Sequence, residues 1–275
     1  MGKLGLLAGG GSLPVHLARH CRRIGRPIFV LRLAGAPQPD LLEFDGSEAR
    51  VDQVGASVEA LRRAGCAEIC LAGTVARPDF TRLEPDALAL KLLPGALAAA
   101  SKGDDALLSF MLTAFEEEGF RAVGAGEVMA ELLLRPGALG DHHPMGRDEA
   151  DMARAFEAAR AIGELDIGQG AVACGGIVLA LEAQEGTDAM LRRTAALPAA
   201  VRGSPRRRRG VLVKACKPGQ DRRVDLPTVG PATIRLAARA GLAGVAGEAG
   251  GLLVLDLDEV RALADRLGLY VVGID

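Results

Sequence analysis

The sequence predicts an α/β protein with a Rossmann-like first domain, built on a parallel sheet, and a second, separate α/β domain. Apolar runs at residues 3–9, 27–35 and 68–74 alternate with amphipathic helical patterns at 13–24 and 54–64. This alternation is typical of βαβ units, whose strands lie side by side in a parallel sheet. The 275 residues, 49% of them hydrophobic and 25% charged, suit one large or two medium-sized domains of a soluble protein.

Helical patterns and a break in periodicity complete the first domain. The patterns predict helices over 85–100 and 104–119, then a short strand and a helix within 120–134. Next comes "RPGALGDHHPMGR", where Pro, Gly and His interrupt every periodicity, as is typical of a connection. The expected organisation is a domain at 1–134, a short linker at 135–147 and a domain at 148–275.

The second domain again mixes helices and strands. Gly175 and Gly176 separate two apolar runs, which is a hairpin signal. The predicted elements are a helix at 148–166, the hairpin strands within 170–184, a helix at 187–197, a strand at 210–217, a helix and turn within 233–249, a strand at 251–257, a helix at 258–268 and a strand at 269–274.

The composition argues against several classes of function. The formal net charge of −2, with one Tyr and no Trp, gives neither the electrostatic attraction nor the stacking platforms of a nucleic-acid binder. The five cysteines are scattered without a zinc-type pattern, so we expect free thiols in a reducing cytosol. No apolar run reaches the ~18 residues that span a bilayer, and no signal-peptide pattern opens the chain. We expect a cytoplasmic protein.

A glycine-rich loop follows the first predicted strand. Gly9, Gly10 and Gly11 precede Ser12, which is placed to cap the helix that starts with Leu13 and Pro14. Backbone amides at such a turn attract phosphate. The dinucleotide fingerprint requires a glycine where Pro14 stands and an acid after the second strand, and both are missing. A phosphate or nucleotide loop and a purely structural turn remain open.

Two further segments could carry a site. In "AGTVARPDF", Gly73 permits close approach and Arg77 could pair with phosphate, although an ordinary turn explains the segment equally well. In residues 166–190, Gln169 lies in a Gly-flanked turn before a strand. Glu182, Glu185, Thr187 and Asp188 gather where the hairpin gives way to a helix. These carboxylates fit a hard cation, and a helix cap is the alternative.

The stretch 214–234 is long and non-periodic, which favours a functional loop. Lys214 and Lys217 are natural phosphate partners, and Asp225 is the acid most embedded in apolar residues. No Gly-x-Ser-x-Gly motif supports a serine nucleophile. Carboxylates, lysines and a phosphate loop in two domains indicate metal-assisted phosphoryl chemistry. The basic run "SPRRRRG" at 204–210 is either a solvated loop or a contact for anionic headgroups.

Six segments in order resemble one family: "LGLLAGGGSLPVHLA", "ARPDF", "KGDDALL", "DIGQGAV", "EAQEGTDAMLRR" and "RVDLPTVG". They resemble the LpxI family, the UDP-2,3-diacylglucosamine pyrophosphatases of lipid A synthesis, and the likeness runs from Lys3 to the final "VVGID". The resemblance implies Mg²⁺-dependent hydrolysis of UDP-2,3-diacylglucosamine to UMP and 2,3-diacylglucosamine 1-phosphate (lipid X). It also implies a cytoplasmic enzyme that is peripheral to the inner membrane, with substrate between two domains.

The resemblance implies that Asp225 is essential for catalysis and that the glycine loop faces the UDP moiety. We hypothesise that Asp225 and Asp188 hold Mg²⁺, that Lys214 or Lys217 neutralises developing charge, and that Gln169 and Thr187 orient water or phosphate oxygens. The expected substrate-binding residues are Gly9, Gly10, Gly11, Ser12, Leu13, Gly73, Arg77, Thr187, Lys217 and Thr228. A nucleotide-dependent oxidoreductase, a nucleotide-sugar-modifying enzyme and a non-catalytic nucleotide- or lipid-binding module are the alternatives. The sequence leaves monomer and homodimer open.

Overall fold

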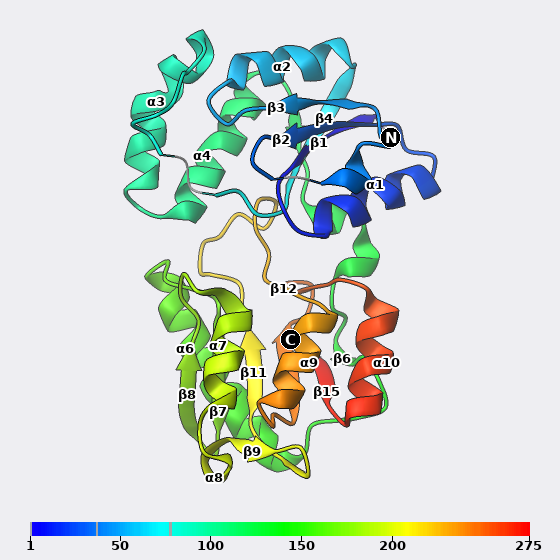
Figure 1. Ribbon diagram of the computed structural model, residues 1–275, viewed down its shortest axis with the longest axis vertical. Coiled ribbons are helices and arrows are strands. Elements are labelled where there is room, and N and C mark those ends of the chain that lie inside the picture. Colours follow the sequence, from blue (N-terminus) through cyan, green and yellow to red (C-terminus); the bar gives the residue numbers. More distant parts are fainter. Residues whose placement is uncertain (1, 37, 77–78) are drawn as a thin grey trace. The chain divides into compact units, whose positions relative to one another are not determined.

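The computed structural model describes residues 2–36, 38–76 and 79–275 (Figure 1). Its internal contacts divide the chain into two units. The N-terminal unit comprises the chain up to Ala130 together with Asp221–Asp225. The C-terminal unit comprises Glu131–Gln220 and Leu226–Asp275. A five-residue segment far along the chain therefore belongs to the N-terminal unit.

The N-terminal unit is built on a parallel sheet with the strand order β3-β2-β1-β4-β5. The strands are β1 (Lys3–Ala8), β2 (Ile28–Leu33), β3 (Gly46–Ala49), β4 (Cys66–Ala72) and β5 (Arg121–Ala122). This order is that of the Rossmann fold, which confirms the predicted fold class. No strand was predicted at β3, because this short edge strand has only one apolar side chain. Gly46 suits it, since a Cβ there would lie 2.0 Å from the Val30 carbonyl oxygen.

Helices cover both faces of this sheet, which explains its continuous apolar strands. On one face, Leu7, Leu31 and Ile69 pack with α2 and α4. Helix α1 packs on the other face through its buried residues. The helices are α1 (Leu13–Arg23), α2 (Val54–Arg63), α3 (Ala87–Ala100), α4 (Asp104–Glu117) and α5 (Ala125–Val128), with 3₁₀ turns η1 (Pro39–Leu41) and, at the junction of the units, η2 (Ala130–Leu132).

The C-terminal unit has a mixed sheet with the order β15-β13-β11-β7-β8. β11 pairs in parallel with β13 and antiparallel with β7. The β7–β8 hairpin is confirmed, with Gly175 and Gly176 at φ +63° and +77°. The strands are β6 (Gly137–Ala138), β7 (Gly170–Cys174), β8 (Ile177–Leu181), β9 (Gly203–Ser204), β10 (Arg207–Arg208), β11 (Val211–Lys214), β12 (Thr228–Val229), β13 (Gly244–Glu248), β14 (Leu253–Val254) and β15 (Tyr270–Ile274).

The strand β13 lies where the sequence predicts a turn. Its residues, GVAGE, include two glycines and an alanine, which have low strand propensity. The fold nevertheless requires Gly244, because a Cβ atom there would lie 2.2 Å from the Tyr270 ring of the neighbouring strand β15. Close packing between two strands thus overrides local propensity at this position.

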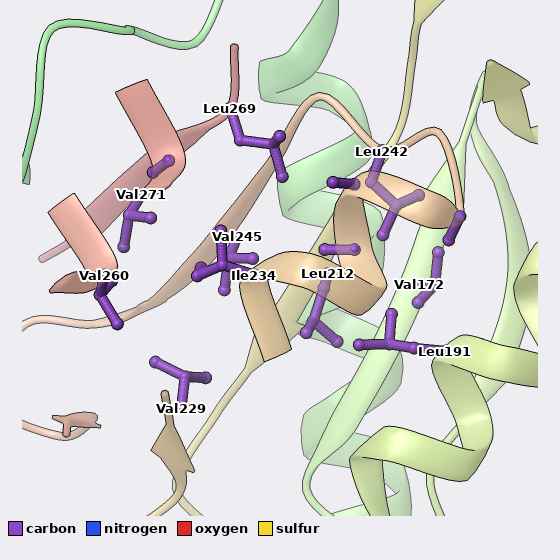
Figure 2. Close-up of a cluster of buried hydrophobic side chains, with 14 of the residues drawn as sticks. Val172, Leu191, Leu212, Val229, Ile234, Leu242, Val245, Val260, Leu269 and Val271 are labelled. Carbon is purple, nitrogen blue, oxygen red and sulfur yellow. The ribbon is translucent and has the colours of Figure 1, made fainter. Parts of the chain in front are cut away.

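Side chains alternate between the two faces of the C-terminal sheet. Ala173, Val211 and Val213 face α6, whereas Val172 and Leu212 face the cluster formed with α7, α9 and α10. Figure 2 shows the second cluster. The helices are α6 (Gly146–Glu164), α7 (Gly186–Ala195), α8 (Ala199–Arg202), α9 (Pro231–Arg239) and α10 (Leu257–Leu267).

The expected linker at 135–147 is part of the C-terminal unit, which corrects the prediction. The N–H group of Leu139 donates to the Val271 carbonyl over 2.8 Å, and that of Asp141 donates to Asp265 Oδ1 over 2.7 Å. These backbone groups are satisfied by β15 and α10, so the segment is anchored despite its irregular composition. The strand predicted at 251–257 is also shorter, being confined to β14, which pairs with β12.

The basic run 204–210 lies at the amino-terminal end of β11, where β9 and β10 form a short antiparallel pair. All five cysteines are buried, and no disulfide joins them in the described chain. Among the residues that the structure describes, no helix has the length and apolarity needed to cross a membrane.

Asp52 ties the segment that follows β4 to the N-terminal unit. Its carboxylate accepts hydrogen bonds from Arg50 Nε (2.9 Å) and Nη2 (2.7 Å) and from the Glu84 N–H (2.9 Å). The hydrogen bonds from Arg50, opposed by burial, lower the pKa of Asp52 from 3.8 to about 2.

Replacing Asp52 with Asn should lower the free energy of unfolding by about 1–3 kcal/mol at neutral pH, because the charge-assisted hydrogen bonds are lost. The native pKa of Asp52 is depressed, so its contribution is complete above pH 3.8 and is lost as the pH falls toward 2. Urea unfolding of both proteins should show a difference that is constant above about pH 4 and shrinks below it. A difference that grows on acidification would contradict this assignment.

Candidate functional site

Two loops meet at the carboxyl ends of the adjacent parallel strands β1 and β4. The N–H group of Gly10 donates to the Thr74 carbonyl over 2.8 Å, and that of Thr74 donates to the Gly10 carbonyl over 2.9 Å. The structure therefore brings Gly9, Gly10 and Gly73 together, and ligands bind at this edge in sheets of this type. Arg77, expected beside them, lies outside the described residues.

Packing between these loops explains two of the glycines. A Cβ atom on Gly9 would lie 2.4 Å from the Thr74 carbonyl oxygen, and one on Gly73 would lie 2.4 Å from that of Gly10. At Gly11 the nearest atom to such a Cβ would be 3.8 Å away, so space does not require glycine. Its left-handed backbone, with φ +88°, does favour glycine.

The remaining amides of the loop are available to a ligand. The N–H groups of Gly9 and Gly10 are used by the carbonyls of Ala72 and Thr74. Those of Gly11, Ser12 and Leu13 have no acceptor among the described residues, and Gly11 and Ser12 are exposed. Because these three amides open helix α1, they suit an anion.

Ser12 does not cap α1, contrary to the expectation from the sequence. Its backbone is itself helical (φ −84°, ψ −18°), and its side chain makes no capping hydrogen bond. An N-cap side chain reaches the first-turn amides from an extended backbone, which Ser12 lacks. The exposed hydroxyl therefore lies beside the open amides without serving the helix.

A second group of polar side chains forms at one edge of the C-terminal sheet. We call Glu182, Thr187 and Lys214 the Glu182 network. Thr187 Oγ1 donates to Glu182 Oε1 over 2.6 Å, Lys214 Nζ donates to Thr187 Oγ1 over 2.7 Å, and Lys214 Nζ lies 3.5 Å from Glu182 Oε1. Lys214 is 4% exposed and Glu182 is 6% exposed. The ammonium is thus buried together with a carboxylate.

Three neighbouring elements bring these residues together. Lys214 ends β11 on the same side of the strand as Leu212, the side that faces α7. Thr187 lies in the first turn of α7, and Glu182 follows β8 directly. Thr187 and Lys214, which the sequence analysis named separately, are therefore in contact at the carboxyl-terminal end of β11.

Gln169 lies beside this network. It precedes β7, where Gly170 pairs with Lys214, and its carbonyl accepts the N–H of Ala215 over 3.0 Å. Gln169 Oε1 and Glu182 Oε2 are buried and have no donor among the described residues. Buried acceptors are usually satisfied, so a bound ligand or water is the expected partner at these two atoms.

The other predicted residues of the C-terminal unit have structural partners. Lys217 forms an ion pair with Asp166, a residue at φ +52°. Asp188 is half-exposed, and its Oδ2 atom lies 3.7 Å from Nη2 of Arg192 on the next turn of α7. Thr228 Oγ1 donates to the Leu226 carbonyl over 3.0 Å.

Asp225 is the last residue of the segment 221–225, which belongs to the N-terminal unit. Arg223 anchors this segment, because its guanidinium group donates to Asp221 Oδ2 and to Glu116 Oε1 of α4, both over 2.7 Å. The hydrogen bonds from Arg223 also hold the pKa of Asp221 below its usual value. Val224 packs against the apolar core of the unit. Asp225 is thereby fixed to a framework of α4 and core residues.

The two expected metal ligands belong to different units: Asp225 to the N-terminal unit and Asp188 to the C-terminal one. Within the described ranges, no group of three or more His, Cys, Asp or Glu residues could hold a metal ion. Mg²⁺ commonly uses one or two carboxylates together with substrate phosphates and water. The partly buried Asp225 fits that binding mode.

Sequence reasoning missed several residues that build these sites. The Arg223–Glu116 pair joins positions 107 apart, and Thr74 and Asp166 act through contacts with distant segments. No local pattern marks such partners. The glycines on both sides of Gln169 do signal a close approach by another side chain, and that side chain is Glu182, which the sequence analysis had already named.

The comparisons with known proteins cover both units. Residues 3–132 match the family model of the LpxI N-terminal domain, and residues 135–272 match that of the LpxI C-terminal domain. A curated relative from Caulobacter vibrioides, "UDP-2,3-diacylglucosamine pyrophosphatase LpxI", is 57% identical over 275 residues, which cover 100% of this chain and 98% of the relative. The resemblance inferred from the six segments is confirmed, and the chain belongs to the LpxI family.

Proposed function

We propose that this chain hydrolyses the pyrophosphate of UDP-2,3-diacylglucosamine in lipid A synthesis, releasing UMP and 2,3-diacylglucosamine 1-phosphate (lipid X). The observation that carries the proposal is the 57% identity, over the full chain, to a relative named for acting on this substrate. Two features support it: the open amides after β1 and the buried ammonium at the end of β11 both suit the anionic oxygens of a pyrophosphate.

In this proposal the glycine loop binds the UDP moiety. The amides of Gly11, Ser12 and Leu13 donate to phosphate oxygens, while Gly9, Gly10 and Gly73 give the two loops their close contact. Arg77 adds a guanidinium group to the same ligand, and Thr228 is a further substrate contact. The missing acid after β2 argues against a dinucleotide in this place.

Lys214 supplies positive charge to the reacting phosphates, and Lys217 is the second candidate for this task. The Lys214 ammonium group has three donors, of which one serves Thr187, so it can also reach a phosphate oxygen. Gln169 and Thr187 orient water or phosphate oxygens. Phosphoryl transfer depends mainly on such positioning and charge neutralisation.

Asp225, with Asp188 as the second candidate, would hold Mg²⁺. When bound, the ion neutralises charge on the pyrophosphate. Water attacks the phosphorus nearer the sugar, so that UMP leaves. The family resemblance implies an enzyme of the cytoplasm, and the two acyl chains of the substrate favour a position at the surface of the inner membrane. The homodimer stays a prediction.

The direct test is incubation of the purified chain with UDP-2,3-diacylglucosamine and either Mg²⁺ or excess EDTA, with chromatographic detection of UMP and lipid X. We expect both products with Mg²⁺ and a loss of at least about a hundred-fold in rate with EDTA, since the metal supplies several kcal/mol of charge stabilisation. Binding without product would instead support a non-catalytic module. A changed nicotinamide absorbance would support an oxidoreductase.

The Asp225→Ala variant should lose turnover by at least about a thousand-fold, because a preorganised charge at the reacting phosphate is removed. Its dissociation constant for the substrate should stay within about three-fold of the wild-type value when both are measured in EDTA, since the loop and Lys214 remain. Asp258→Ala is the matched control, because Asp258 is 89% exposed and contacts only the helix neighbour Arg261 in the described chain. Near-normal hydrolysis by Asp225→Ala would exclude its role.

A further inference from the structure

The directions of the hydrogen bonds in the Glu182 network are fixed by chemistry. The Lys214 ammonium can only donate, so Thr187 Oγ1 must accept over the 2.7 Å that separates them. The single hydroxyl proton of Thr187 is then available to Glu182 Oε1, 2.6 Å away. Glu182 is the terminal acceptor of this chain, and its charge balances the buried ammonium.

The surrounding backbone leaves room for Glu182. A Cβ atom on Gly170 would lie 2.5 Å from Glu182 Oε2, and one on Gly168 would lie 2.2 Å from the Glu182 carbonyl oxygen. The Glu182 N–H also donates to the Gly170 carbonyl over 2.8 Å. Two glycines that flank Gln169 thus permit this carboxylate at the strand end, which explains the Gly-Gln-Gly pattern independently of any phosphate.

We infer that Glu182 is a positioning residue, which orients Thr187 and Lys214 so that a remaining ammonium proton points at the substrate phosphates. The inference rests on the proposed function. Lys214 Nζ lies 3.5 Å from Glu182 Oε1 but 2.7 Å from Thr187 Oγ1. The carboxylate therefore acts on the ammonium group chiefly through the Thr187 hydroxyl. Glu182 itself is buried and does not need to touch the substrate.

The first test is Glu182→Gln, which keeps the size and one acceptor oxygen but removes the charge. We expect kcat to fall about ten- to a hundred-fold, because a small misplacement of a catalytic group has costs of this order. KM should stay within about three-fold, since the interaction lost acts mainly in the transition state. The matched control is Glu157→Gln, which should keep the wild-type kcat and KM, because Glu157 is 70% exposed and pairs with Arg154 on helix α6.

The second test separates positioning from a merely structural role through a double-mutant cycle with Thr187→Val. If Glu182 acts through Thr187, adding Glu182→Gln to Thr187→Val should change kcat by less than about two-fold. Effects that multiply would overturn the inference. Thermal unfolding of each variant shows whether the fold is kept.

A second variant covers the case in which Glu182→Gln does not fold. Glu182→Asp keeps the charge but is one methylene too short to reach Thr187, so it should show the same fall in kcat. Wild-type kcat in either variant would overturn the inference while leaving the proposed function intact. A wild-type chain that releases no UMP would overturn the proposed function, and this inference with it.

Discussion

The C-terminal unit depends on one physical constraint, the burial of a charged ammonium group at the end of its central strand. Removing Lys214 from water is costly unless a carboxylate and hydrogen bonds accompany it. Glu182 and Thr187 meet that need, and they do so only because Gly168 and Gly170 leave space and α7 begins beside β8. Leu212 of β11 lies in the apolar cluster that Figure 2 shows. Lys214, two residues further along the same side of the strand, lies in the Glu182 network.

The candidate site residues of the N-terminal unit are held by different contacts. The amides of the glycine loop and the carboxylate of Asp225 both belong to the N-terminal unit, although about two hundred residues separate them in the chain. Arg223 makes this possible by linking its segment to α4 through Glu116. The residues assigned to the reaction are therefore divided between two units. In each unit they are held by contacts within that unit.

The sequence carried the parts of the fold that follow from periodicity and turn chemistry. The parallel strands and the Gly175–Gly176 hairpin follow rules of local pattern. β13 was missed because glycine is a poor strand former. Gly244 is needed there only to make room for the Tyr270 ring, which is distant in the sequence. The predicted cap at Ser12 was wrong, because serine is a good capping residue but the backbone of Ser12 is helical rather than extended. Glu182, Thr187 and Lys214 were named from the sequence by residue type, but the hydrogen bonds that join them needed the structure.

The segment 221–225 has a practical consequence for dividing this protein into pieces. A gene cut after Ala130 would yield an N-terminal fragment without Val224 in its core and without the guanidinium partner of Glu116. Such a fragment would expose apolar surface and leave a carboxylate without its ion pair. Fragment complementation, crystallography of isolated domains and domain exchange between relatives therefore need a design that supplies this short peptide, by fusion or by circular permutation.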